Sequence, residues 1–179
     1  RIVTNLIENG YAGEIFVISS SAPETVDHAA VHDGRVRARW IEGVEGLLAP
    51  VDLVVVSVPP AALPDVLGSL ADRARSVLII SSLDESVDAE AVRAACAALM
   101  EHGVAVIGPN SAGLYEDATG PVTFSKAFAF ENMPSSWSSS RSYVVSQSGA
   151  FGVRVVSGAL LRGVGVAGRS TPSPQCAAT

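Results

Sequence analysis

The stretches IGPNSAG, from Ile107 to Gly113, and YVVSQSGAFG, from Tyr143 to Gly152, decide the fold of this chain. Each of them places a turn of small residues directly after a short apolar strand. In the second stretch a helix is predicted to begin at Gly149 and to run to about Arg162. A strand that passes through a glycine turn into a helix is the repeating unit of a parallel α/β sheet.

The same alternation of strands and helices extends through the rest of the chain. Apolar positions recur at helical spacing from Leu63 to Ala74 and from Val92 to Met100, with Asp88 as the N-cap of the second helix and Gly103 as its end. Five short β-branched runs flank these helices and are apolar enough to be covered on both faces, which predicts parallel strands. They are 15–18, 53–58, 77–80, 104–107 and 143–145. The pattern predicts a doubly wound α/β sheet.

The domain organisation is predicted from changes in composition. The opening residues 2–9 indicate a helix that ends at Gly10, so we expect a strand and loop to precede it and the chain to be a truncated piece. Residues 1–118 form the first predicted domain, and the aperiodic, serine-rich residues 119–142 form a linker. Residues 143–179 open a second domain. The tail from Arg169, with Pro172 and Pro174, is expected to be irregular or poorly ordered.

The amino-acid composition argues against several classes of partner and site. The formal net charge is −6 and Lys126 is the only lysine, so no basic stripe is available to meet a nucleic-acid backbone. The histidines and the two cysteines, Cys96 and Cys176, have neither metal-ligand nor disulfide-framework spacing. No apolar run reaches membrane-spanning length and no signal peptide is visible. We therefore expect a cytoplasmic protein without a metal site.

Candidate binding residues follow the strands, because ligands of open parallel sheets bind beyond the carboxyl ends of the strands. The three loops of the first domain contain Val58-Pro59-Pro60, Ser81-Ser82-Leu83-Asp84-Glu85 and Gly108-Pro109-Asn110. Each has a plain structural alternative: a proline-initiated helix, acids that complement a helix dipole, and a turn.

A candidate anion site lies at the start of the helix after Tyr143. Ser146, Ser148, Gly149 and Ala150 would offer hydroxyls and backbone N–H groups at a helix N-terminus, which favours a phosphate. The alternative is a turn with an N-cap serine, and for an isolated SxSG pattern that alternative is favoured.

The order of VPP, SSLDE, IGPNSAG and SQSGAFG resembles the NDP-forming acid–CoA ligases, such as the succinyl-CoA synthetase α subunit and the ADP-forming acetyl-CoA synthetases. The resemblance covers residue 1 to about Val166. It implies a Rossmann-like CoA-binding domain that has lost its first strand and glycine-rich loop, followed by the start of a flavodoxin-like domain. It also implies synthesis of acyl-CoA from a small carboxylic acid, CoA and a nucleoside triphosphate, through an acyl phosphate and a phosphohistidine.

The resemblance also implies residue roles. In the first domain, CoA would be bound by Val58, Pro59, Pro60, Ser81, Ser82, Glu85, Gly108 and Pro109. Asn110 would approach the thiol and acyl centre, and Ser146, Ser148, Gly149 and the Ala150 amide would receive the phosphate. ATP or GTP with magnesium, an ATP-grasp β-type domain or subunit, and an oligomeric assembly would belong to the complete enzyme.

The chain departs from the family pattern in several places, so two rival functions stay open. The family commonly has cysteine at Ser111 and, in many acetyl-type members, glycine at Ser82; its active histidine matches none of His28, His32 and His102. The stretch from Gly168 to Pro174 stands where the family has a strand and a Gly-Asn loop. One rival is a CoA-sensing regulatory module of the kind fused to lysine acetyltransferases. The other is an NAD(P)-binding oxidoreductase domain, although no GxGxxG motif occurs in the first predicted domain.

Overall fold

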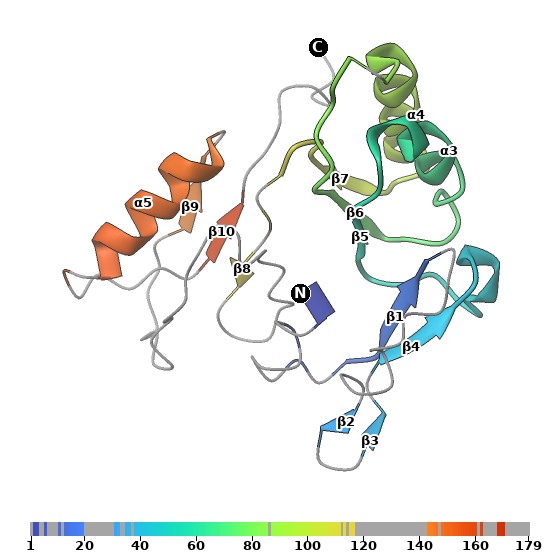
Figure 1. The fold of residues 1–179 in the computed structure, drawn as a ribbon, viewed down its shortest axis with the longest axis horizontal. Helices are drawn as coiled ribbons and strands as arrows, with labels where there is room; N and C mark the ends of the chain where they lie inside the picture. Colours follow the sequence, from blue (N-terminus) through green and yellow to red (C-terminus); the bar gives the residue numbers. More distant parts are fainter. Residues whose placement is uncertain are drawn as a thin grey trace.

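The computed structural model of the chain is shown in Figure 1. It describes residues 2–3, 6, 11, 13–19, 31–32, 35–36, 38–85, 87–111, 113, 115–116, 143–146, 148–160, 162 and 168–170. The strands are β1 (Ile15–Ile18), β2 (Val31–His32), β3 (Arg35–Val36), β4 (Ala38–Ile41), β5 (Val54–Val56), β6 (Ser76–Ile79), β7 (Ala105–Ile107), β8 (Tyr115–Glu116), β9 (Tyr143–Val145) and β10 (Gly168–Ser170). The helices are η1 (Val44–Gly46), η2 (Pro60–Ala62), α3 (Leu63–Gly68), α4 (Ala89–Glu101) and α5 (Gly149–Leu160).

The three-stranded sheet β5-β6-β7 forms the centre of the described fold. Both of its pairings are parallel, with Val54 opposite Val77 and Val77 opposite Val106. Leu78 in the middle strand is fully buried, as are Val77 and Ile79 on either side of it, so both faces of β6 are covered. A parallel strand that is apolar at every position is buried in this way. The predicted parallel α/β sheet, with strands close to the predicted bounds, is confirmed.

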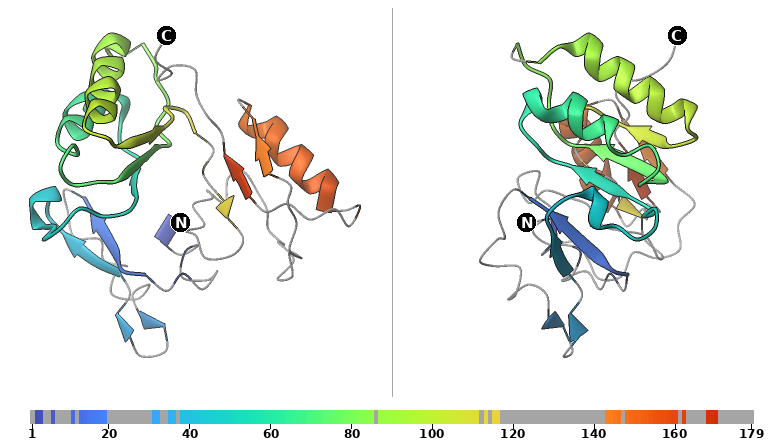
Figure 2. Two further views of the ribbon diagram at one scale, coloured as in Figure 1. Left: turned by 180° about the vertical axis from the view of Figure 1, so that it is seen from behind. Right: turned by 90° about the vertical axis from the view of Figure 1, so that its right-hand side faces the viewer.

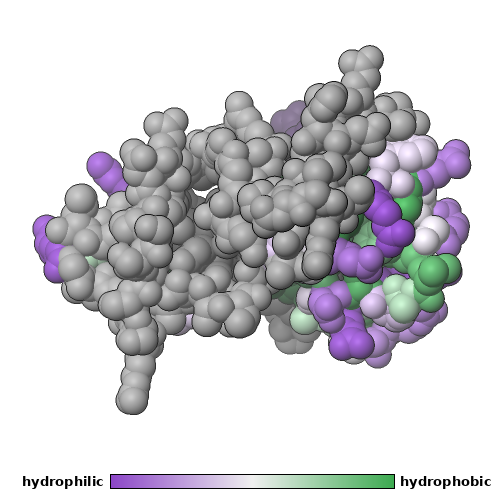
Figure 3. Space-filling view, turned by 90° about the horizontal axis from the view of Figure 1, so that it is seen from below, coloured by the Kyte–Doolittle hydropathy of each residue, from purple (hydrophilic) through white to green (hydrophobic). Residues whose placement is uncertain are grey.

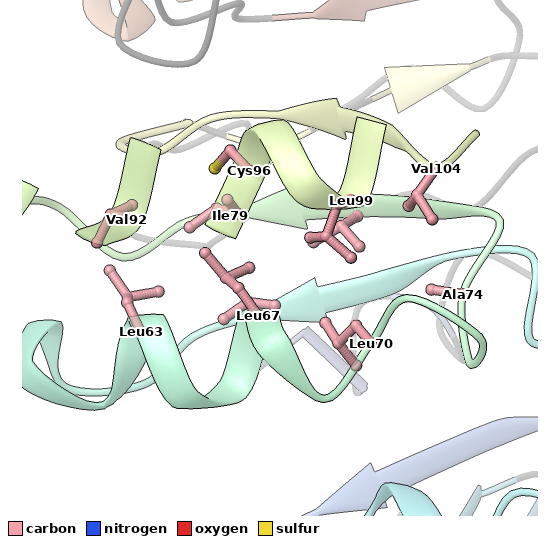
Figure 4. Close-up of a cluster of buried hydrophobic side chains, with 11 residues drawn as sticks. Leu63, Leu67, Leu70, Ala74, Ile79, Val92, Cys96, Leu99 and Val104 are labelled. Carbon is pink, nitrogen blue, oxygen red and sulfur yellow. The ribbon is translucent and has the colours of Figure 1, made fainter. Parts of the chain in front are cut away.

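The main hydrophobic core lies between this sheet and the helices α3 and α4. In Figure 4 the side chains of Leu63 and Leu67 from α3 point toward those of α4, with Ile79 behind them. Val92, Cys96 and Leu99 of α4 are essentially inaccessible to solvent, as their helical spacing predicts. Both helices thus anchor the sheet on one face and fix the positions of its carboxyl-end loops.

The ends of α4 follow directly from its sequence. The Asp88 carboxylate accepts hydrogen bonds from the backbone N–H groups of Glu90 and Ala91, at 2.9 and 3.2 Å. Gly103 has a φ of +79° just beyond the helix, a conformation that glycine adopts without a steric penalty. Both predicted boundary residues are confirmed. His102 is exposed at the helix end, with Nδ1 2.8 Å from the Ala98 carbonyl oxygen.

The helix α3 is shorter than the apolar spacing predicts. It ends at Gly68, and the hydroxyl of Ser69 donates to the Val66 carbonyl at 2.7 Å. Leu70 and Ala74 are nevertheless buried, because the turns after α3 carry them into the same core. The burial was predicted correctly, but the helical conformation of residues 69–74 was not.

A second parallel pair, β1 and β4, lies beside the β5 edge of the central sheet in the views of Figures 1 and 2. The strand β4 was not predicted from the sequence, because ARWI interrupts its apolar residues with arginine. The Trp40 indole N–H of β4 lies 3.2 Å from both the carbonyl and the hydroxyl oxygen of Ser19, just after β1. Among the described residues, β1-β4 and β5-β6-β7 are two separate parallel sheets.

The last described sheet has the order β8-β10-β9. Its strand β10 runs parallel to β9 and antiparallel to β8, and α5 connects β9 to β10. The prediction of an irregular tail from Arg169 is therefore wrong for residues 169 and 170. Each strand residue there pairs with a neighbour, so hydrogen bonding overrides the weak apolar signal of Gly-Arg-Ser. Residues 171–179 lie outside the described part, as does the predicted linker, residues 119–142.

The surface of the described part is mixed. In Figure 3 hydrophilic and hydrophobic residues lie side by side on the face in view. Isolated exposed apolar residues, of which Leu48 is one, are ordinary on protein surfaces. None of the described helices is both long and apolar enough to cross a membrane.

Candidate functional site

The three predicted binding loops of the first domain lie together at the carboxyl edge of β5-β6-β7. They begin at Ser57, Ile80 and Gly108, immediately after three adjacent parallel strands. Several of their residues are exposed to solvent: Pro59, Ser82, Asp84, Glu85 and Asn110. Parallel strand order thus brings together the residues that the sequence placed 20 to 50 positions apart, as a ligand site at such an edge requires.

Ser81 joins the first two of these loops. Its hydroxyl accepts a hydrogen bond from the Val58 N–H at 2.9 Å and donates one to the Val58 carbonyl at 2.7 Å. The last backbone bond between the two strands runs from the Ile80 N–H to the Val56 carbonyl. The Ser81 side chain therefore holds Val58 beyond the point at which the strand ladder stops.

The third loop is tied to the second by its backbone. The Asn110 N–H donates to the Ser81 carbonyl at 2.9 Å, and the Ser111 N–H donates to the Ile79 carbonyl at 3.1 Å. Asn110 itself has a φ of +59°, in the left-handed region that asparagine tolerates better than most residues, and its side chain is exposed. The loop thus presents Asn110 outward from a fixed backbone.

Gly108 allows the third loop to approach β6 closely. Its φ is +110°, and a Cβ atom added there would lie 2.4 Å from the Ile79 carbonyl oxygen. The bond from Gly108 to Pro109 is cis, and both residues are buried. Gly108 and Pro109, predicted as cofactor contacts, therefore lie beneath the exposed edge, where they shape the loop that carries Asn110.

The predicted anion turn has the geometry of a capped helix start. The Ser148 hydroxyl lies 3.3 Å from the Phe151 N–H, whose hydrogen bond it accepts, and the Ser148 carbonyl accepts from Gly152 at 2.9 Å. The Ser146 hydroxyl donates to the same carbonyl at 2.8 Å. The N-cap role of Ser148 is thus present. The first two amides of α5, those of Gly149 and Ala150, precede these bonds and belong to the N-terminal turn, whose N–H groups have no partner within a helix.

The two predicted groups of site residues are organised separately. The hydrogen bonds of the first three loops connect them to one another, whereas those of Ser146 and Ser148 stay within their own turn. Among the described residues no cluster of three histidine, cysteine or carboxylate side chains is placed to hold a metal ion.

The sequence did not reveal the linking role of Ser81, because that role depends on the register between strands, which the structure supplies. Continuing the register from Val56 opposite Ile79 places Val58 opposite Ser81. Continuing the register of β6 with β7 from Leu78 opposite Ile107 places Ser81 opposite Asn110. A serine at the middle position of three loops is a candidate for a hydrogen-bonded link.

Comparison with known proteins gives one curated relative. Over 127 residues the chain is 24% identical to the protein named acetate–CoA ligase [ADP-forming] II from Archaeoglobus fulgidus. The alignment covers 69% of the chain but only 17% of the relative. The chain therefore spans a small part of that protein's length.

Solved structures with a similar fold include two of acetyl-coenzyme A synthetase 1 from Candidatus Korarchaeum cryptofilum. The apo form covers 99% of this chain at a TM-score of 0.72 and 20% identity, and this chain corresponds to 36% of its length. A form described as in complex with phosphate and ADP gives a TM-score of 0.70 at 21% identity, with 99% and 35% of the two chains covered. A protein from Pyrococcus horikoshii gives 0.63 at 17% identity, covering 94% of this chain and 42% of its own.

One family model also matches, over residues 1–85, and it describes an NADP oxidoreductase that depends on coenzyme F420. The match is confined to the first part of the Rossmann-like fold and ends before the Gly108 loop and the Ser146 turn. Fold similarity extends over 99% of the chain. The comparisons confirm the resemblance drawn from the motifs: the curated relative and the first solved neighbours are acetyl-CoA synthetases, consistent with the NDP-forming acid–CoA ligase family.

Proposed function

We propose that this chain is the CoA-binding part of an NDP-forming acid–CoA ligase, which makes acyl-CoA from a small carboxylic acid, CoA and a nucleoside triphosphate. The observation that carries the proposal is the joined edge of three loops after β5, β6 and β7. These loops contain the VPP, SSLDE and GPN motifs in the order that the family resemblance requires. The curated relative, an acetate–CoA ligase, supports the same assignment.

Coenzyme A would lie across the exposed parts of this edge. Val58, Pro59 and Pro60 would form an apolar, stiff wall along the pantetheine and adenine path, since proline fixes the backbone there. Ser82 and Glu85 are exposed in the next loop and would supply polar contacts. Asn110, exposed at the tip of the third loop, would meet the thiol and the acyl group. Gly108, Pro109 and Ser81 would support these contacts from below.

The helix start at Gly149 would hold the transferring phosphate. The free amides of a helix N-terminus and its positive dipole favour an anion, and glycine allows the close approach that a phosphate needs. The Ser146 and Ser148 hydroxyls would turn from their present bonds within the loop toward the phosphate. Such preorganised donors stabilise charge on a phosphoryl group during transfer.

The complete reaction requires groups that these residues do not supply. We propose that a phosphohistidine, an ATP-grasp domain or subunit and ATP or GTP with magnesium complete the enzyme, and that the enzyme is an oligomer. The residues would then bind and orient CoA and the acyl phosphate for attack by the thiol. The proposed compartment is the cytoplasm, where CoA and nucleoside triphosphates are supplied to such ligases.

A nicotinamide-binding oxidoreductase is the second candidate, and the family model over residues 1–85 favours it. The matched residues 1–85 contain no GxGxxG motif, the glycine-rich turn with which such folds approach the cofactor pyrophosphate. The experiment is titration calorimetry of the full-length protein with CoA and, separately, with NADPH. Saturable CoA binding well ahead of NADPH supports the ligase assignment, whereas tighter binding of NADPH would overturn it.

A further inference from the structure

We propose that Ser81 is a positioning residue for CoA, one that acts through the backbone of Val58 and not by contact with the ligand. The inference rests on the proposed function, because it concerns the same edge of the sheet. The Ser81 hydroxyl donates its only hydrogen to the Val58 carbonyl, and its oxygen accepts a hydrogen bond from the Val58 N–H. Both bonds go to Val58.

The geometry gives this link a specific purpose. The pairing of β5 with β6 ends at Val56 opposite Ile79, and the last backbone bond joins the Ile80 N–H to the Val56 carbonyl. The N–H and the carbonyl of Val58 would then lose their ladder partners, and unpaired backbone groups that are partly buried are costly. The Ser81 side chain bonds to both groups. At Val58 it therefore supplies the hydrogen-bond partners that the backbone of a neighbouring strand would otherwise supply.

The link also connects all three loops through one residue. While its side chain holds Val58, the Ser81 carbonyl accepts from the Asn110 N–H. Ser81 therefore fixes the first loop through its side chain and the third loop through its backbone. Only the first of these links is lost in Ser81→Ala, which makes the side-chain role separable by mutation.

Ser76, at the opposite end of β6, offers a matched control. Its hydroxyl donates to the Asp52 carbonyl, so it forms the same kind of bond between a serine side chain and the backbone that leads into or out of β5. Ser76 is at the amino end of the strand, away from the proposed ligand edge. Ser76→Ala loses one exposed bond and Ser81→Ala loses two partly buried ones, so Ser81→Ala should lower thermal stability more, but only Ser81→Ala should weaken CoA binding.

The test is CoA titration of the full-length wild type, Ser81→Ala, Ser81→Thr and Ser76→Ala, well below their unfolding temperatures. We expect Ser81→Ala to weaken CoA binding roughly tenfold, the change that corresponds to the free energy of about one hydrogen bond. Ser81→Thr keeps a hydroxyl and should restore most of the affinity, and Ser76→Ala should bind as the wild type does. In steady-state assays the KM for CoA should rise while kcat stays near the wild-type value.

A double variant tests whether the effect of Ser81 passes through the segment Val58-Pro59-Pro60. Pro59→Ala loosens the same segment, so adding Ser81→Ala to it should weaken CoA binding much less than tenfold further. Full additivity of the two changes, or unchanged CoA affinity in Ser81→Ala, would overturn the positioning role while leaving CoA binding itself intact. If the wild type binds no CoA, the proposed function fails first and the positioning role with it.

Discussion

Gly108 illustrates how a single residue shapes the candidate site. A side chain at this position meets two obstacles: a positive φ and the Ile79 carbonyl oxygen, 2.4 Å from the Cβ position. We expect Gly108→Ala to lower the free energy of unfolding by about 3 kcal/mol, because left-handed strain and a backbone clash add. Equilibrium unfolding in denaturant of the variant and the wild type measures this.

Substitutions at two other glycines allow the backbone strain and the steric clash to be measured separately. Gly103 has a φ of +79° but open space around its Cβ position, so Gly103→Ala should show strain alone, about 1 kcal/mol. Gly68 lies in α3 with open space and an ordinary φ, so Gly68→Ala should be neutral or slightly stabilising. A Gly108→Ala loss no larger than that of Gly103→Ala would contradict the close approach of the third loop to β6.

Two substitutions in the turn at Ser148 distinguish helix capping from phosphate binding. Ser148→Ala removes the cap on the Phe151 N–H and should cost about 1 kcal/mol of helix stability. Gly149→Val tests phosphate binding at the same turn. In the full-length enzyme it should abolish phosphoenzyme formation from labelled nucleotide, because valine crowds the approach of an anion. CoA affinity should stay unchanged, because the proposed CoA contacts lie in other loops. A folded Gly149→Val enzyme that phosphorylates at the wild-type rate would leave Ser148 as a cap only.

At the scale of elements, α4 shows which features were predictable from the sequence. Asp88, the apolar spacing of Val92, Cys96 and Leu99, and Gly103 are all local signals, and each is found as predicted. The strands β4 and β10 were missed because their short, polar-interrupted sequences form strands only by pairing with distant partners. The hydrogen bonds between the Ser81 hydroxyl and the Val58 backbone were not predicted for the same reason. They depend on the register between two strands and not on any motif.

The cap of α4 gives a prediction at this scale. Asp88→Ala should lower the free energy of unfolding by about 1 kcal/mol, since two backbone N–H groups lose their acceptor. Asp88→Asn keeps a side-chain oxygen and should recover most of that loss. Thermal or denaturant unfolding of the three proteins gives the comparison, and equal stability of Asp88→Ala and the wild type would show that the cap contributes nothing.

For the molecule as a whole, strand order brings three separate motifs to one edge of the sheet, which we propose as the CoA site. The fold class and the positions of the three loops followed from the sequence, because parallel strands align their carboxyl ends. The solvent exposure of the individual loop residues could not be predicted from the sequence. Gly108 and Pro109 are buried and the Ser81 hydroxyl bonds to Val58, whereas Pro59, Ser82, Glu85 and Asn110 are exposed.

Hydrogen exchange of the full-length protein with and without saturating CoA shows whether CoA covers this edge. Exchange slows where a ligand covers or stiffens the backbone. We expect CoA to slow exchange in the three segments 57–62, 80–85 and 108–113 together, while α4, which faces the core, changes little. Protection confined to other segments, or no change in any of the three with CoA bound, would contradict the assignment of this edge as the CoA site.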